Sequence, residues 1–148
     1  MSQDILEKVR MFLEAASKDA VEVPDELIEE FGKACADSFR KQFTDQRNKE
    51  FGLRASNIGR PLCQLQMEKQ GTKGEGQPYN AKMRNLFGDL IEQLAIIVMK
   101  SAGVNIESEQ TRIKFRATDN TEINGALDVE IDGKVWDIKT ASPYAYTS

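Results

Sequence analysis

The chain has 148 residues, of which 40% are hydrophobic and 30% charged, and its net charge is −4. This composition and length indicate one ordinary soluble globular domain with a core of its own. No apolar run approaches the roughly 18 residues that a membrane span requires, and the N-terminus lacks a signal peptide, so we expect a cytoplasmic protein that does not enter a membrane.

The chain contains no histidine and only two cysteines, Cys35 and Cys63. Two isolated cysteines are too few for a disulfide framework or a thiolate cluster, and their apolar surroundings favour buried free thiols. The absence of histidine excludes catalytic triads with histidine, histidine general bases and His-ligated zinc. Any catalysis must therefore use carboxylates, lysine, tyrosine or a metal.

Charge is unevenly distributed along the chain. Residues 51–103 carry seven basic and four acidic residues, a net charge of +3, whereas the segments on either side are acidic. The overall negative charge argues against nucleic-acid binding through bulk basicity. A local basic surface beside an acidic metal site would nevertheless suit a phosphodiester substrate.

Two amphipathic helices are predicted in residues 1–50. Apolar residues recur at helical spacing over residues 3–17, and a second helix begins at Pro24, which suits the first helical position. We expect these helices to form an antiparallel hairpin. A packing or partner-docking role is favoured for this segment over a chemical one.

A third helix is predicted from an N-cap at Ser56 to about Gln70, with Arg54 and Arg60 near its start. Helix N-termini attract phosphates through free N–H groups and the helix dipole, so these three residues are candidate phosphate ligands. The alternative is a capped helix with solvated arginines. The glycine-rich stretch 71–78 lacks the spacing of a Walker loop and is interpreted as a connection that borders the substrate.

The longest helical pattern runs from Ala81 to Ala102 and ends at Gly103. Gly88 and Glu92 lie on one stripe of this helix, separate from its apolar face. A glycine within a helix costs about 1 kcal/mol relative to alanine, so we expect Gly88 to serve close packing and to bring Glu92 towards the sheet. A solvent-facing Glu92 is the alternative.

The remaining chain predicts strands. Residues 104–110 and 112–117 alternate and are followed by a turn at Asp119-Asn120. Ala126–Ile131 and Lys134–Ile138 flank Asp132-Gly133, a strong hairpin signal because both central residues of the turn need positive φ. The fold class is therefore predicted as α+β, with a helical N-terminal half packed on a small, mainly antiparallel or mixed sheet.

The hairpin register places Asp128 opposite Asp137, which is a repulsive arrangement. Side chains alternate along strands, so one face carries apolar residues and the other carries Asp128, Glu130, Asp137 and Lys139. A divalent cation would offset the repulsion. Oxygen ligands without histidine or cysteine favour Mg²⁺ or Mn²⁺, with the Ile138 carbonyl as a further ligand. The alternative is a solvated polar face on which Lys139 only balances the aspartates.

Three segments together resemble the PD-(D/E)XK nuclease superfamily, and most closely its RecB-type and lambda-exonuclease-type branch. They are Phe87-Gly-Asp-Leu-Ile-Glu92, Gly125-Ala-Leu-Asp128 and Asp137-Ile-Lys139-Thr140. The resemblance runs from about Arg54 to the C-terminus, so it divides the chain into residues 1–50 and a nuclease-like core of residues 51–148 within one compact domain. It implies a restriction-endonuclease-like core and metal-dependent hydrolysis of DNA.

The resemblance also implies residue roles. Glu92, Asp128 and Asp137 would be catalytic metal ligands and Lys139 the catalytic lysine, while Arg54, Ser56 and Arg60 would bind a terminal phosphate. The implied setting is an exonuclease of phage or bacterial recombination or repair. Its expected partners are DNA, a recombination protein docked on residues 1–50, and further copies of the chain.

Members of this superfamily usually continue past the Asp-x-Lys strand into a helix that carries glutamine and tyrosine. Here the sequence reaches Ser148 nine residues after Lys139. We therefore expect a core that is truncated or does without this helix. This expectation keeps open an alternative function, namely a non-catalytic nucleic-acid-binding or assembly module on a nuclease fold.

Overall fold

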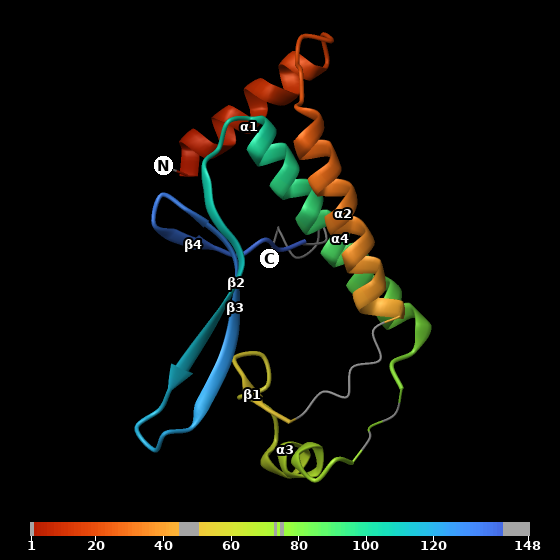
Figure 1. The fold of residues 1–148 in the computed structure, drawn as a ribbon, viewed down its shortest axis with the longest axis vertical. Helices are drawn as coiled ribbons and strands as arrows, with labels where there is room; N and C mark the ends of the chain where they lie inside the picture. The colour runs from red at the N-terminus through yellow and green to blue at the C-terminus, as the bar shows by residue number, and fades with distance from the viewer. Residues whose placement is uncertain (1, 45–50, 73, 75, 141–148) are drawn as a thin grey trace, which may run out of the picture.

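The computed structural model describes residues 2–44, 51–72, 74 and 76–140. The long helices α2 and α4 lie on one side of the molecule and a small sheet on the other, with α3 beside β1 (Figure 1), so the predicted α+β fold is confirmed. In chain order the elements are α1 (Ser2–Ala16), α2 (Asp25–Phe43), β1 (Leu53–Arg54), α3 (Leu62–Lys69), α4 (Tyr79–Ser101), β2 (Ile106–Arg116), β3 (Glu122–Ile131) and β4 (Lys134–Trp136). Among these residues, no helix is both long and apolar enough to cross a membrane. The expectation that the core lacks a helix after the Asp-x-Lys strand concerns residues 141–148, which lie outside the described residues.

The sheet is built around β3. Strand β2 pairs with β3 in antiparallel fashion from Ile106 to Arg116. β1 pairs in parallel with the N-terminal end of β3, at Ile123 and Asn124, and β4 pairs in antiparallel fashion with its C-terminal end. Because β2 occupies one edge of β3 along its length, β1 and β4 share the other edge. Between them, the middle of that edge is not paired with a described strand.

The predicted hairpin between β3 and β4 is confirmed. Asp132 and Gly133 have φ values of 51° and 67°, as its turn requires. Ile131 pairs with Lys134 and Val129 pairs with Trp136, which is the expected register. β4 ends at Trp136, however, two residues before the predicted end.

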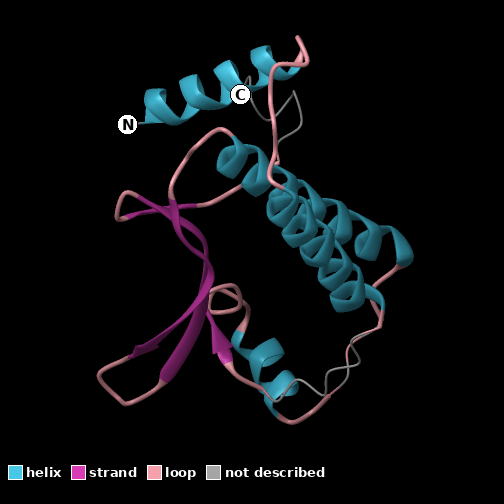
Figure 2. Cartoon of the chain, turned by 45° about the horizontal axis from the view of Figure 1, so that its top comes forward, coloured by secondary structure: helices cyan, strands magenta, loops and turns pink. Residues whose placement is uncertain are grey.

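β2 is one continuous strand where two were predicted. Gln110 is the last residue of the first predicted strand and has a φ of 48°, a left-handed conformation that is uncommon outside glycine. The pairs Glu109–Val129 and Thr111–Leu127 flank it on both sides, so the ladder continues past the unusual residue. Figure 2 shows that the two long paired strands twist strongly about each other.

The two N-terminal helices do not form the predicted hairpin. α2 packs along α4, while α1 crosses near the C-terminal end of α4 and is not packed lengthwise on α2 (Figure 1). Lys41 bonds to Asp89 at one end of the α2–α4 pair and Glu30 bonds to Lys100 at the other, so the two helices are antiparallel. The long helix α4 is thus the partner of both.

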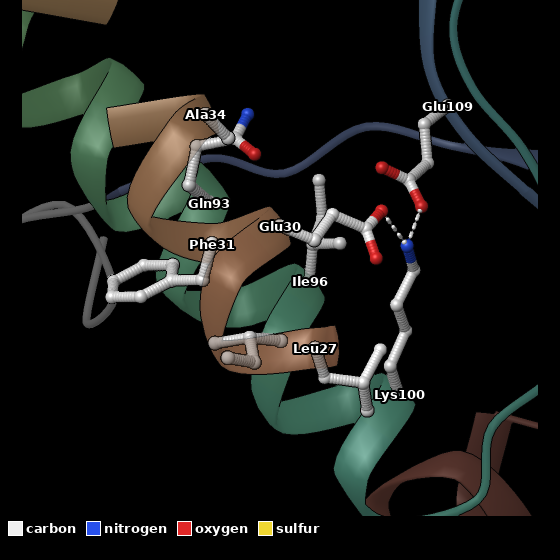
Figure 3. Close-up of a pocket in the computed structure, with 9 residues that line it drawn as sticks. Leu27, Glu30, Phe31, Ala34, Gln93, Ile96, Lys100 and Glu109 are labelled. Atoms are coloured by element: carbon white, nitrogen blue, oxygen red, sulfur yellow. Dashed lines mark hydrogen bonds and ion pairs between the residues drawn. The ribbon is translucent and has the colours of Figure 1, made fainter. Parts of the chain in front are cut away.

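Lys100 ties three elements together at this interface. Its ammonium group lies 2.6 Å from Glu30 of α2 and also pairs with Glu109 of β2, beside a small pocket lined by apolar residues of α2 and α4 (Figure 3). The two carboxylates raise the pKa of Lys100 against the opposing effect of partial burial. We interpret this pocket as part of the helix–sheet junction.

The core of the described residues is small. Ile96, Val104, Val129 and Ile131 form it, and Ile5, Met99, Ile106, Trp136 and Ile138 pack against it. The predicted apolar face of the hairpin is therefore confirmed for Val129, Ile131, Trp136 and Ile138. The accessible surface of 11,700 Å² is far larger than the roughly 7,600 Å² expected for a compact monomer of this mass. The molecule is more open than a compact domain. One reason is that the part of the β2–β3 pair that ends at Arg116 and Glu122, called here the β2–β3 arm, extends away from α1, α2 and α4 (Figure 1).

Candidate active site

Two segments meet beside the unpaired middle of the β3 edge. Asp128 lies on β3, and Asp137 and Lys139 follow the end of β4. The backbone N–H of Ile138 donates to Asp128 Oδ2 at 3.0 Å, so a side chain rather than a strand ladder holds this segment against β3. The predicted meeting of Asp128 and Asp137 is thereby achieved beyond the end of β4.

Asp137 and Lys139 form a pair at the solvent-facing side of the site. Lys139 Nζ lies 3.0 Å from Asp137 Oδ1 and 2.9 Å from Oδ2. The hydrogen bond from Lys139 lowers the pKa of Asp137. The pKa of Lys139 is raised by Asp137, and also by the charges of Asp128 and Glu92. Each of the four predicted catalytic residues therefore interacts electrostatically with at least one of the others.

Glu92 enters the site from α4 and is half-buried. Its pKa is raised, first by burial and then by the negative charges of Asp128 and Asp89. The side-chain amide of Gln110 donates a hydrogen bond to Glu92 Oε1 and partly opposes this shift. The alternative of a fully solvated Glu92 is therefore wrong.

Gln110 is a site residue that sequence reasoning missed. It lies across the ladder from Asp128, because Glu109 pairs with Val129 and Thr111 with Leu127. Consecutive side chains of a regular strand point to opposite faces, yet Glu109 and Gln110 both bond to α4. The positive φ of Gln110 breaks the regular strand geometry at the point where these two neighbouring residues both contact α4. No local signal in the sequence marks it.

Asp89 is a second acidic residue near Glu92 that was missed. Lys41 Nζ lies 3.1 Å from Asp89 Oδ2, and Gln42 Nε2 donates to the same oxygen at 2.9 Å. Asp89 and Glu92 are three residues apart on α4, a spacing that places side chains side by side on a helix. That spacing could have identified Asp89 as a neighbour, although its partners on α2 could not be foreseen.

The oxygen donors of Glu92, Asp128 and Asp137 are of the type that a hard divalent cation prefers. Within the described ranges, no three acidic or cysteine side chains lie close enough together to hold a metal ion. Glu92 is bonded to Gln110, and Asp137 is bonded to Lys139. A cation held by these acids would compete with Gln110 for Glu92 and with Lys139 for Asp137. The role of the Ile138 carbonyl stays a prediction.

Arg54, Ser56 and Arg60 do not surround a helix start, so that prediction is wrong. Residues 55–59 form turns, and α3 begins only at Leu62, after Pro61. The first turn is organised by buried Asn57, whose Oδ1 accepts from the Arg54 N–H at 2.7 Å. Arg60 is paired with Glu68 at 2.9 Å, whereas Arg54 and Ser56 are exposed. The three residues therefore do not lie at a helix N-terminus, and their role in phosphate binding stays a prediction.

Two smaller expectations are also wrong. A Cβ atom added to Gly88 would meet nothing within 4 Å outside its own helix, so Gly88 does not serve close packing. Cys63 is an exposed free thiol and Cys35 is only partly buried, so the expectation of two buried thiols fails. Glu92 reaches the sheet because of the position of α4, without help from a small residue.

Comparison with known proteins identifies no relative. No family model matches the chain, and neither a curated protein nor a solved structure is similar to it at a significant level.

Proposed function

We propose that this protein is a DNA nuclease that depends on Mg²⁺ or Mn²⁺ and hydrolyses phosphodiester bonds. The observation that carries the proposal is the contact between Asp128 and the segment Asp137–Lys139, which gathers two acids and a lysine at one partly exposed point. Glu92 adds a third carboxylate within electrostatic reach. Stability alone does not require like charges to meet in this way, because their repulsion is unfavourable.

The chemistry follows from the residue types. A hard divalent cation supplies Lewis acidity and an activated water, and Glu92, Asp128 and Asp137 would hold it. Lys139 is a cation whose side chain reaches Asp137 at 3.0 Å, beside the position proposed for the metal. Its proposed role is to stabilise the negative charge that develops on the phosphate.

The test is digestion of linear and circular DNA with Mg²⁺, with Mn²⁺ and with a chelator. Asp128→Asn and Lys139→Ala are each expected to lower the metal-dependent rate by about 100-fold or more. Asp132→Asn is the matched control, because it removes a nearby carboxylate outside the site and asparagine tolerates the positive φ of this turn. Equal activity in the wild type, Asp128→Asn and Lys139→Ala would overturn the proposal.

The same digestion addresses the mode of action. An exonuclease degrades linear DNA and spares covalently closed circles, which is the behaviour we expect of an enzyme of phage or bacterial recombination or repair. Cleavage of closed circles would instead indicate an endonuclease.

Docking of a recombination protein on residues 1–50 is tested by deleting residues 1–45, and loss of partner binding is the expected result.

A non-catalytic nucleic-acid-binding or assembly module is the second candidate. It is favoured by the engagement of Glu92 with Gln110 and of Asp137 with Lys139, which leaves no three acids converging within the described ranges. This function predicts DNA binding that persists in a chelator and no cleavage with any cation. Turnover that requires both a metal and Asp128 would exclude it.

A further inference from the structure

A row of basic side chains lies on the sheet face that carries Asp128. Arg112, Lys114 and Arg116 are spaced two residues apart along β2, so they share one face. Directly opposite residues of an antiparallel pair also share a face. Their partners on β3 are, in order, Ala126, Asn124 and Glu122. These three alternate in step with Asp128, which places the basic row and the acidic site on one face.

β1 adds a fourth positive charge to this face. Arg54 pairs with Asn124 from one side of β3, and Lys114 pairs with Asn124 from the other. Arg54, Asn124 and Lys114 therefore lie side by side across three strands. We call Arg54, Arg112, Lys114 and Arg116 the basic face.

The basic face is exposed and largely uncompensated. All four side chains are exposed, and only Lys114 has an ion pair, at 3.0 Å from Glu122. The three arginines form no side-chain hydrogen bond or ion pair with another residue of the described chain. The protein as a whole is acidic, so this concentration of positive charge does not reflect bulk composition.

We propose that the basic face binds the sugar-phosphate backbone of a nucleic acid and leads it to Asp128. The inference rests on the proposed function, since it names the surface along which the substrate of that site lies. From Arg112 to Arg116 the strand rises about 13 Å, which matches about four phosphates of one strand along a duplex axis. Arg112 lies opposite Ala126, only two positions from Asp128. The row therefore begins beside the reacting carboxylates and extends along the arm in Figure 1.

An anionic membrane is the other polyanion that such a face could meet. Peripheral membrane binding combines basic residues with apolar side chains that insert at the same surface. Here the exposed apolar residues of the arm, Ile113 and Phe115, alternate with the basic ones and point to the opposite face. A nucleic-acid backbone is therefore the better fit.

The experiment measures DNA binding separately from cleavage. Fluorescently labelled duplex DNA is titrated with full-length Asp128→Asn protein in a chelator, with and without the added double substitution Arg112→Gln/Arg116→Gln. Each lost phosphate contact weakens binding about eightfold at 0.1 M salt, so about 60-fold is expected for two. The log–log slope of affinity against salt should become shallower by about 1.8. Arg54→Gln, on a different strand, is expected to weaken binding by about eightfold.

The matched control is Lys18→Gln/Lys33→Gln, which removes the same charge from exposed positions near α1 and on α2. The inference is overturned if DNA affinity falls equally in the control and in Arg112→Gln/Arg116→Gln, or if it falls in neither. Binding of the parent protein to anionic vesicles but not to DNA also overturns it. If circular dichroism shows that Arg112→Gln/Arg116→Gln is unfolded, the test is made with Arg54→Gln. Unchanged DNA affinity of Arg54→Gln then overturns the inference.

The two proposals fail in distinguishable ways. Binding that depends on the basic face without any metal-dependent cleavage contradicts the nuclease function alone. Cleavage that requires Asp128 but is unchanged in Arg112→Gln/Arg116→Gln, together with unchanged binding, contradicts the basic face alone.

Discussion

The side-chain amide of Gln110 donates a hydrogen bond to the carboxylate of Glu92 from a strand residue whose φ is 48°. A left-handed conformation costs a non-glycine residue about 1–2 kcal/mol, so the surrounding contacts must offset it. The contacts of Gln110 with Glu92 and of Glu109 with Lys100 are the ones available. An unfavourable backbone conformation is thus retained at the point where β2 faces the candidate site.

Substitution of Gln110 should separate backbone strain from side-chain bonding. Gln110→Val is expected to lower the free energy of unfolding by about 1–2 kcal/mol or more, because a β-branched residue is strongly disfavoured at positive φ. Gln110→Gly should change it by less than about 1 kcal/mol, since relief of strain offsets the greater freedom of the unfolded chain. Urea denaturation measures both values.

Thr111→Val is the matched control for Gln110. It places the same β-branched residue at the next position of β2, which lies in the regular ladder opposite Leu127 and is exposed. Its stability should remain within about 0.5 kcal/mol of wild type. If Gln110→Val is as stable as Thr111→Val, the positive φ imposes no cost and the interpretation is wrong.

The raised pKa of Glu92 predicts a pH dependence of stability. The folded state binds the Glu92 proton more tightly than the unfolded state, so stability falls as pH rises from about the ordinary value of 4.5 through the raised pKa. Above that window the penalty is constant. Glu92→Gln should therefore be more stable than wild type near pH 7, by up to about 1 kcal/mol after solvent screening, and the difference should vanish below pH 4.5.

Thermal unfolding of both proteins between pH 4 and pH 8 checks this expectation. Glu29→Gln, at an exposed position of α2, is the control and should follow the wild-type curve throughout. Destabilisation of Glu92→Gln at neutral pH would contradict the expectation, because it would show that the Gln110 hydrogen bond outweighs burial and the neighbouring negative charges.

The hairpin could be predicted because its information is local. Asp132 and Gly133 supply the positive φ of the turn, and the turn then sets the register that brings Asp128 near Asp137. The alternation of the strands placed Val129 and Ile131 in the core for the same reason. These features depend on residues adjacent in sequence.

The errors have tertiary or steric causes. The helix expected from Ser56 begins only after Pro61, because the residue before a proline is pushed out of helical conformation. Periodicity identified the two N-terminal helices but not their partners, so the packing of α2 on α4 was missed. Gln110 was missed because its role depends on its bond to Glu92 of α4, a residue 18 positions earlier in the sequence.

Lys100 should be more important for stability than an ordinary surface lysine. Lys100→Met removes a cation that is only 19% exposed and leaves Glu30 and Glu109 close together without it. The expected loss in unfolding free energy is about 1–3 kcal/mol, below that of a fully buried pair because the site is partly solvated. Lys8→Met, which breaks an exposed pair with Asp4 at 3.4 Å, should cost less than about 0.5 kcal/mol. Equal urea midpoints for the two variants would contradict the three-element role of Lys100.

Asp128 has two roles that two substitutions can distinguish. Its carboxylate accepts the Ile138 N–H, and its charge acts on Glu92 and Lys139. Asp128→Asn keeps an acceptor and should remain within about 0.5 kcal/mol of wild-type stability, whereas Asp128→Ala leaves the N–H unpaired and should cost about 1–2 kcal/mol. Amide hydrogen exchange at Ile138 should accelerate in Asp128→Ala only, while metal-dependent cleavage should be lost in both. Faster exchange in Asp128→Asn as well would mean that the negative charge, rather than the acceptor, holds the segment that carries Asp137 and Lys139 against β3.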